Sequence, residues 1–402
     1  MDTTEDVIPG TSVSSSRGEG MRQEDTEASR LHITGRYWPT DQQELLLRAA
    51  LLEESEAIQA WHGIRDRLDL DHVDIGSRRL LPLLAANLRR HGVDDSDLGG
   101  CLQLYSETRS QNHALFDAVA AVVRMLTAAG IETMVLKGWA LAELYYKDIG
   151  LRPMSDVDLL VRRTDARRAS LILQQLGWSP EDDVTPSFAR TRHGVTFKNR
   201  PGQQCDLHWW IFEEYCPASL DEDVWASSIA VDLQSASTRV PAPADQFLHV
   251  CIHGAKWART PGIRWIADAV LMLRAGQIDW HRLISQAERR GFVLRMQQTL
   301  RYLRALTDVP IPAEAWSQLA SCPVSRFERF EHWVRSRDHA LMGALPFHWC
   351  NYLRSVEAGS LVTVLGFSRY LQDLWGLDSV NQVLPAAFAR AAVRVRGRPK
   401  TS

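Results

Sequence analysis

The chain lacks the features that mark membrane, secreted and disulfide-bonded proteins. No stretch approaches the roughly 18 consecutive apolar residues that a membrane-spanning helix needs. The N-terminus lacks the basic and then apolar pattern of a signal peptide, so we expect a cytoplasmic protein. The six cysteines are scattered and form no Cys-x-x-Cys pair. The sequence therefore predicts reduced thiols rather than a disulfide framework or a zinc site.

A strong charge of one sign is also missing. The formal net charge is −3 over 402 residues, and this weak balance argues against a nucleic-acid substrate, because tracking phosphates usually needs a basic surface. Apolar residues make up 45% of the chain and charged residues 24%, which is typical of an ordinary globular protein. The length favours two or three domains.

Composition and periodicity divide the chain into five parts. The first residues are rich in small polar and acidic types with few large apolar groups, which is typical of disorder. Apolar residues then recur at helical spacing, give way to short strands after Gly130, and return to helical spacing beyond Ala242. The predicted parts are a disordered tail (1–35), an N-terminal helical region (36–129), a central core (130–240), a C-terminal helical domain (241–385) and a basic tail (386–402).

The central core alternates between strands and helices. We expect a strand over 131–137, a helix over 139–146, a strand over 157–161 and a helix over 166–176. A hairpin follows, with arms at 194–198 and 203–210 around a turn at 199–202. The predicted fold class is α+β, with a small mixed sheet flanked by N-terminal and C-terminal helical regions.

Two carboxylates lie close together on the second predicted strand. Asp156 and Asp158 are two residues apart, so both side chains point to the same face, about 6 to 7 Å apart along the chain. At an effective dielectric near 20, two charges about 5 Å apart repel by roughly 3 kcal/mol. A hard divalent cation such as Mg²⁺ would offset that repulsion. The alternative is a pair of solvated or capping aspartates at a strand end.

A third carboxylate lies on the second arm of the hairpin. Asp206 shares a strand face with Gln204 and His208. The polar side of the sheet is therefore expected to gather Asp156, Asp158 and Asp206 around one point. His208 orients a ligand, contacts a bound substrate, or is a structural histidine.

Several motifs together resemble a bacterial nucleotidyltransferase family of the DNA polymerase β-like nucleotidyltransferase superfamily, many members of which are uncharacterised. The similarity runs from about residue 80 to 310. It is carried by Leu136-Lys137-Gly138, Tyr145-Tyr146, Arg152-Pro153-Met154-Ser155-Asp156-Val157-Asp158-Leu159-Leu160-Val161, Leu176-Gly177-Trp178, Asp206-Leu207-His208-Trp209 and Arg264-Trp265-Ile266-Ala267-Asp268.

The resemblance implies a role for each group of residues. Asp156, Asp158 and Asp206 would hold Mg²⁺, as two ions that activate the acceptor and neutralise the leaving pyrophosphate. Gly138 would open a helix toward the triphosphate of ATP or another nucleoside triphosphate, with Lys137 and Arg152 as its cationic contacts. The chain departs from the wider superfamily in having Lys137-Gly138-Trp139 where Gly-Ser is usual.

Some of these residues have simpler alternatives. Lys137 could be a solvated lysine at a strand end, and Arg152 could pair with a local carboxylate. Asp268, on an otherwise apolar helix, is either a general base for the acceptor or half of an ion pair with Arg264 or Lys256.

His249 and His253 stand one helical turn apart. The glutamate of a zinc-binding His-Glu-x-x-His motif is absent, so we expect one of them to line a cleft with Lys256 instead.

The leading functional hypothesis is transfer of a nucleoside monophosphate, AMP from ATP, to a hydroxyl or phosphate of a small molecule. One alternative is transfer to a macromolecule such as a tRNA or a protein side chain. The other is a nucleotide-binding or partner-binding module without catalysis, which the altered turn at Trp139 keeps open. No membrane partner is expected, and the sequence does not determine an oligomeric state.

Overall fold

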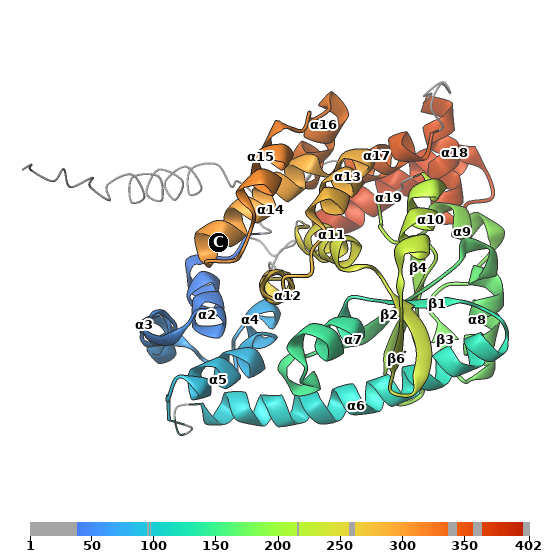
Figure 1. The fold of residues 1–402 in the computed structure, drawn as a ribbon. Helices are drawn as coiled ribbons and strands as arrows, with labels where there is room; N and C mark the ends of the chain where they lie inside the picture. Colours follow the sequence, from blue (N-terminus) through green and yellow to red (C-terminus); the bar gives the residue numbers. More distant parts are fainter. Residues whose placement is uncertain are drawn as a thin grey trace, which may run out of the picture. The chain divides into compact units, whose positions relative to one another are not determined.

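The computed structural model describes residues 38–94, 96, 98–214, 217–256, 262–336, 344–356 and 364–396. The predicted tail 1–35 and residues 397–402 of the predicted basic tail lie outside these ranges. Within them, helices surround a mixed sheet (Figure 1), so the predicted α+β class is confirmed. None of the described helices is both long enough and apolar enough to cross a membrane.

Seven strands among the described residues form one sheet in the order β3-β4-β5-β2-β1-β7-β6. The strands are β1 (Thr133–Leu136), β2 (Asp156–Val161), β3 (Ser179–Pro180), β4 (Gly194–Lys198), β5 (Gln204–His208), β6 (Ile229–Leu233) and β7 (Ala236–Val240). The four predicted strands correspond to β1, β2, β4 and β5. Sequence periodicity did not predict β3, which has two residues, or the β6–β7 hairpin, most of whose first strand is exposed.

The pairing of β2 with β5 positions the acidic residues. These two strands are parallel, and their register places Asp158 opposite Asp206 and Leu160 opposite His208. Strands β1 and β4 lie on either side of the pair, and both run antiparallel to their neighbour. Directly opposed residues on neighbouring strands are about 5 Å apart, so the register brings the two carboxylates together.

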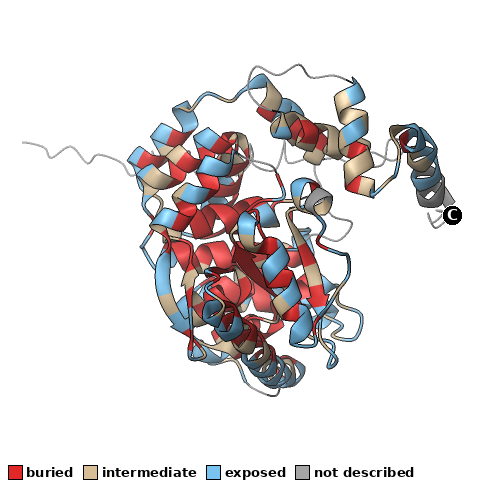
Figure 2. Cartoon of the chain, turned by 90° about the vertical axis from the view of Figure 1, so that its right-hand side faces the viewer, coloured by how far each residue is buried: buried red, intermediate tan, exposed pale blue. Residues whose placement is uncertain are grey.

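The long helix α6 (Gly99–Ala128) packs its apolar face against the sheet. Leu115, Phe116, Val119, Val123 and Leu126 are buried in the same cluster as the strand residues. Figure 2 shows that buried residues concentrate along the strands and on the inner faces of the helices. Helix α6 therefore packs as part of the core, although the sequence analysis placed it in the N-terminal helical region.

The remaining N-terminal elements are short helices. They are α2 (Asp41–Leu51), α3 (Glu54–Ile64), η1 (Arg65–Arg67), α4 (Ile75–Arg78) and α5 (Leu81–Arg90). Helix α2 begins at a capping box between Thr40 and Gln43. The Asp74 side chain caps α4 by accepting hydrogen bonds from the backbone amides of Gly76 and Ser77. Arg79 follows directly after this short helix.

Helices and turns of the core connect its strands. They are α7 (Gly138–Leu141), the π-helical turn η3 (Ala142–Tyr146), η4 (Ile149–Leu151), η5 (Arg163–Asp165), α8 (Ala166–Gln175), α9 (Pro186–Thr191) and α10 (Ala218–Ser227). The predicted helix over 139–146 is thus α7 continued by η3.

The region after β7 is helical, as predicted. It contains α11 (Pro243–Gly254), α12 (Arg264–Arg274), α13 (Trp280–Arg290), α14 (Val293–Leu306), α15 (Ala313–Ser321), α16 (Arg326–Arg335), α17 (Leu345–Ser355), α18 (Val364–Trp375), η6 (Val380–Gln382) and α19 (Val383–Arg396). The predicted start of the basic tail at residue 386 falls inside α19.

Candidate active site

A cleft of ≈ 290 Å³ lies where β1 ends and β2 begins, facing the end of α11 and the start of α12. Six of the seven predicted site residues line it, and the seventh, Asp206, lies beside Asp158 on β5. The six are Lys137, Gly138, Arg152, Asp156, Asp158 and Asp268. The fold therefore gathers the predicted residues from positions up to 131 residues apart in sequence (137 to 268).

Asp158 is the most enclosed carboxylate of the strand pair. Its side chain is 8% exposed, and its Oδ1 lies 2.9 Å from Lys137 Nζ and 3.0 Å from His208 Nε2. Burial by itself raises the pKa of Asp158, but the neighbouring Lys137 and His208 outweigh it and hold that pKa well below its usual range. Asp158 is therefore an anion held between two nitrogen groups.

Asp206 is less fully compensated than Asp158. Its Oδ1 is buried and has no hydrogen-bond partner. Burial raises the pKa of Asp206. A hydrogen bond from Thr196 and the charge of His208 offset this rise only in part, and the charges of Asp158 and Asp156 add to it. A buried carboxylate oxygen without a donor needs a proton or a cation beside it.

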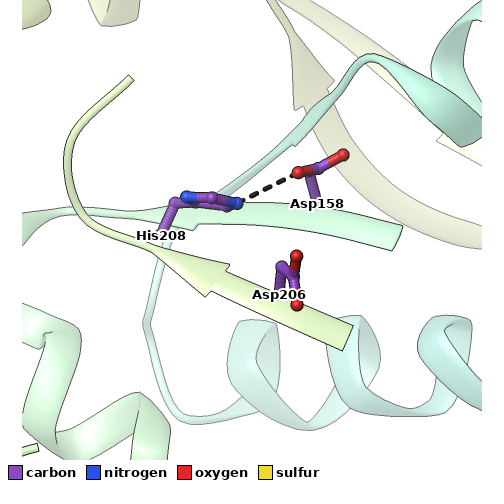
Figure 3. A group of neighbouring side chains, drawn as sticks. All are labelled: Asp158, Asp206 and His208. Atoms are coloured by element: carbon purple, nitrogen blue, oxygen red, sulfur yellow. Dashed lines mark hydrogen bonds and ion pairs between the residues drawn. The ribbon is translucent and has the colours of Figure 1, made fainter. Parts of the chain in front are cut away.

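Asp158, Asp206 and His208 form a group that could hold a metal ion. One ligand atom from each residue lies within 4.8 Å of the others, and Figure 3 shows the three side chains on the neighbouring strands β2 and β5. The unpartnered Asp206 oxygen and the oxygen-rich donor set fit a hard divalent cation. His208 also hydrogen-bonds Asp158, the arrangement by which a histidine orients a carboxylate ligand.

Asp156 lies at the rim of this group. It is half-buried at the start of β2, lines the cleft and accepts a hydrogen bond from Ser155 Oγ at 3.3 Å. The structure thus places the predicted trio around one region and adds His208 as a close neighbour. The predicted strand face and the motif around Asp206 had both pointed to His208.

Lys137 is not a solvated strand-end lysine. Its side chain is 14% exposed, and its Nζ lies 3.0 Å from His253 Nε2 as well as beside Asp158. Its backbone has φ 41°, a value that non-glycine residues seldom adopt and that tertiary contacts must maintain. The β1–α7 turn therefore directs an ammonium group at the strand carboxylates.

Gly138 lies at a closely packed position. A Cβ at this position would lie 2.9 Å from Met154 Sδ and 3.5 Å from Arg152 Nη1. The missing side chain lets the segment that carries Arg152 approach the turn.

The next residue, Trp139, faces the core. Its indole is fully buried, stacks on Phe116 at 5.1 Å between ring centroids, and donates from Nε1 to Glu143 at 2.7 Å. The indole that replaces the usual serine is thus a packing group.

Arg152 and Asp268 form a buried ion pair. Arg152 Nε donates to Asp268 Oδ1 at 2.9 Å and Nη2 donates to Oδ2 at 2.8 Å. The Tyr146 hydroxyl donates to the same Oδ1 at 2.7 Å. Although burial raises the pKa of Asp268, the charge of Arg152 reverses the shift and lowers it.

These contacts favour the ion-pair alternative for Asp268, because both of its oxygens are occupied and its basicity is reduced. The partner differs from the predicted Arg264 or Lys256. Arg152 lies 116 residues away in sequence, too far for the pairing to be predicted from local patterns.

His253 and Lys256 line the cleft, as expected, and the His249 and His253 rings lie 5.8 Å apart between centroids. The metal-ligand group found among the described residues does not include them. Arg79 also lines the cleft. The sequence analysis missed it, and no local signal on its short helix would have revealed it.

A family profile described as "uncharacterised nucleotidyltransferase" matches residues 75–308, more than half of the chain. The chain belongs to this family. The matched region contains all seven predicted site residues, and the resemblance drawn from the motifs is confirmed. The enzyme class that the family supports is nucleotidyltransferase.

Comparison with solved structures found nucleotidyltransferase-related chains at low similarity. The solution structure of antibiotic-resistance factor ANT(2'')-Ia is 11% identical with a TM-score of 0.33, covering 48% of this chain and 98% of that one. An antigenic nucleotidyltransferase-like protein from Paracoccidioides brasiliensis is 14% identical with a TM-score of 0.34, covering 52% and 94%. None of the curated proteins compared with the chain matches it. The assignment therefore rests on the family profile.

Proposed function

We propose that this nucleotidyltransferase transfers a nucleoside monophosphate, AMP from ATP, to a hydroxyl or phosphate of a small molecule and releases pyrophosphate. The observation that carries the proposal is the parallel β2–β5 register, which sets Asp206 beside Asp158, and Asp158 lines a cleft together with several cations. A pure nucleotide-binding protein has no need of two opposed, half-compensated carboxylates. The reaction is proposed to occur in the cytoplasm.

The residues proposed to hold Mg²⁺ are Asp156, Asp158 and Asp206. When bound, the metal would withdraw charge from the phosphates and from the attacking oxygen. His208 orients Asp158 through its 3.0 Å contact. The carboxylate oxygens then serve as the metal ligands, which suits Mg²⁺ because this ion prefers oxygen. The buried, unpartnered oxygen of Asp206 supports this assignment.

Lys137 has two proposed tasks. Without metal its ammonium neutralises Asp158. Once a divalent cation takes over that charge, the Lys137 ammonium is free to face the phosphates of the donor in the same cleft. This role fits a lysine held at a constrained turn better than a purely structural contact would.

The proposal is tested by measuring pyrophosphate release. Wild type, Asp158→Asn, Asp206→Asn and the control Asp117→Asn are incubated with each of the four nucleoside triphosphates, Mg²⁺ and a pool of small molecules. Asp117 is exposed on α6 and does not line the cleft. We expect each β2–β5 variant to lose at least about a hundredfold in rate, because phosphoryl transfer is catalysed mainly by positioning and by stabilising the charge that develops on the phosphate.

Product masses increased by one nucleotide would identify the donor and the acceptor. Equal release by wild type and Asp158→Asn would contradict the proposal. Nucleotide binding without turnover on any small molecule would favour a macromolecular acceptor or a non-catalytic module.

A further inference from the structure

Three arginines from distant parts of the chain line one side of the cleft. Arg79 follows α4, Arg152 precedes β2 and Arg264 is the first residue of α12. Arg152 lies close enough to Arg264 for each charge to act on the other, and Arg79 also acts on Arg264. Like charges gather in one place only when something opposite compensates them.

Among the described residues, only Arg152 of the three has a direct ion pair, with Asp268, whose charge also acts on Arg264 from farther away. Both oxygens of Asp268 are taken by Arg152, one of them shared with Tyr146. Arg264 donates to the Pro153 carbonyl oxygen, which is neutral. Among the described residues, neither Arg79 nor Arg264 has a carboxylate partner within 4.0 Å. Burial lowers the pKa of Arg264, and the charge of Arg152 lowers it further.

Two further donors point to an anion. Arg152 Nη1 is buried and has no hydrogen-bond partner, although Nε and Nη2 of the same guanidinium are occupied. Helix α12 begins at Arg264 in the cleft, where Ile263 is the N-cap residue, and it lacks a side-chain cap. Its first amides carry partial positive charge, so a cation such as Arg264 is unfavourable at this end unless an anion joins it.

We propose that Arg79, Arg152 and Arg264, with the first turn of α12, form an oxyanion subsite that binds a phosphate-class group. Guanidinium groups suit this ligand because they pair with two oxygens at once. The occupant would be either the terminal phosphates of the donor or an anionic group on the acceptor. The identity of that occupant rests on the proposed function, whereas the subsite itself does not.

The test is binding of inorganic pyrophosphate to the metal-free full-length chain, measured by calorimetry. Arg79→Gln and Arg264→Gln are each expected to weaken binding about tenfold, the effect of losing one hydrogen bond to a charged group. Arg78→Gln is the matched control: Arg78 neighbours Arg79, is exposed and does not line the cleft. Thermal unfolding measures whether each variant folds. If Arg264→Gln fails to fold, Arg79→Gln still tests the proposal, because Arg79 is only half-buried.

The proposal would be overturned if the wild type did not bind pyrophosphate. It would also be overturned if Arg79→Gln and Arg264→Gln bound pyrophosphate with the same affinity as the control Arg78→Gln. Repeating the titration with a saturating non-hydrolysable ATP analogue and Mg²⁺ separates the two sources. Competition assigns the subsite to the donor phosphates, and continued binding assigns it to the acceptor. Pyrophosphate binding needs no turnover, so failure of the proposed function would leave this result intact.

Discussion

At the scale of single residues, Lys137 differs most from an ordinary lysine. It contacts Asp158 and His253 from a turn whose backbone lies at positive φ. Its ammonium lies 2.9 Å from the buried carboxylate of Asp158 and neutralises that charge. The stability of the metal-free protein therefore depends in part on this cation, alongside the contact of His208 with Asp158.

Replacing Lys137 tests that dependence. Lys137→Met should lower the free energy of unfolding without metal by about 3 kcal/mol, because a buried carboxylate loses its partner. Mg²⁺ should restore most of the loss, since a divalent cation supplies the missing charge. Denaturant unfolding with and without Mg²⁺ measures both effects.

Lys256→Met is the control, because Lys256 lines the same cleft but pairs with the more exposed Glu213 at 2.7 Å. If Mg²⁺ stabilises Lys137→Met no more than it stabilises wild type, the proposed exchange of cations is wrong.

At the scale of elements, the β1–α7 turn lies between the carboxylates of β2 and the segment before β2 that carries Arg152. Gly138 allows the approach of Met154 and Arg152, and Trp139 anchors the turn in the core by stacking on Phe116. In this short motif, Gly138 therefore allows two segments to approach closely, and the adjacent Trp139 packs in the core.

A double substitution tests the close approach. Gly138→Ala should lower the free energy of unfolding by about 1 to 3 kcal/mol, because the new Cβ overlaps Met154 Sδ. Combining it with Met154→Ala should recover part of that loss, and the coupling is read from a double-mutant cycle. Gly99→Ala is the control, because a Cβ there meets no atom within 4 Å. Strictly additive effects would mean that Met154 does not limit the turn.

At the scale of the whole described chain, buried ion pairs join the segment after β5 to the C-terminal helices. Glu214 Oε1 lies 2.9 Å from Arg295 Nη1 on α14 and 3.7 Å from Arg335 Nη1 on α16. Burial alone would raise the pKa of Glu214, but these arginines hold it well below its usual value of 4.5. The helical region is thus tied electrostatically to the strand that carries Asp206.

Glu214→Gln should lower the free energy of unfolding at neutral pH by about 3 kcal/mol, because the buried Arg295 loses its carboxylate partner, whereas Arg335 keeps Glu331. The depressed pKa means that this contribution is complete above pH 4.5 and declines as the pH falls toward the folded-state pKa. The difference from wild type should therefore shrink between neutral pH and about pH 3. Glu56→Gln, at an exposed position on α3, is the control. A difference that stays constant with pH would exclude ionisation of Glu214 as its source.

The sequence by itself determined the local features of this protein. Strand periodicity was enough to put Asp156 with Asp158, and Asp206 with His208, on shared faces, because side-chain direction along a strand depends only on neighbouring residues. Glycines and helical spacing were enough to predict the α+β class and four of the strands. The motifs were enough to predict the family.

Only the tertiary structure decided which of these faces meet. The β2–β5 register, the placing of Lys137 on Asp158 and the pairing of Arg152 with Asp268 join residues tens of positions apart. Such contacts depend on packing over the whole core and leave no periodic signal in the sequence. The position of Arg79 in the cleft could not be predicted for the same reason. Arg152 and Arg264 line the same cleft but lie far from Arg79 along the chain.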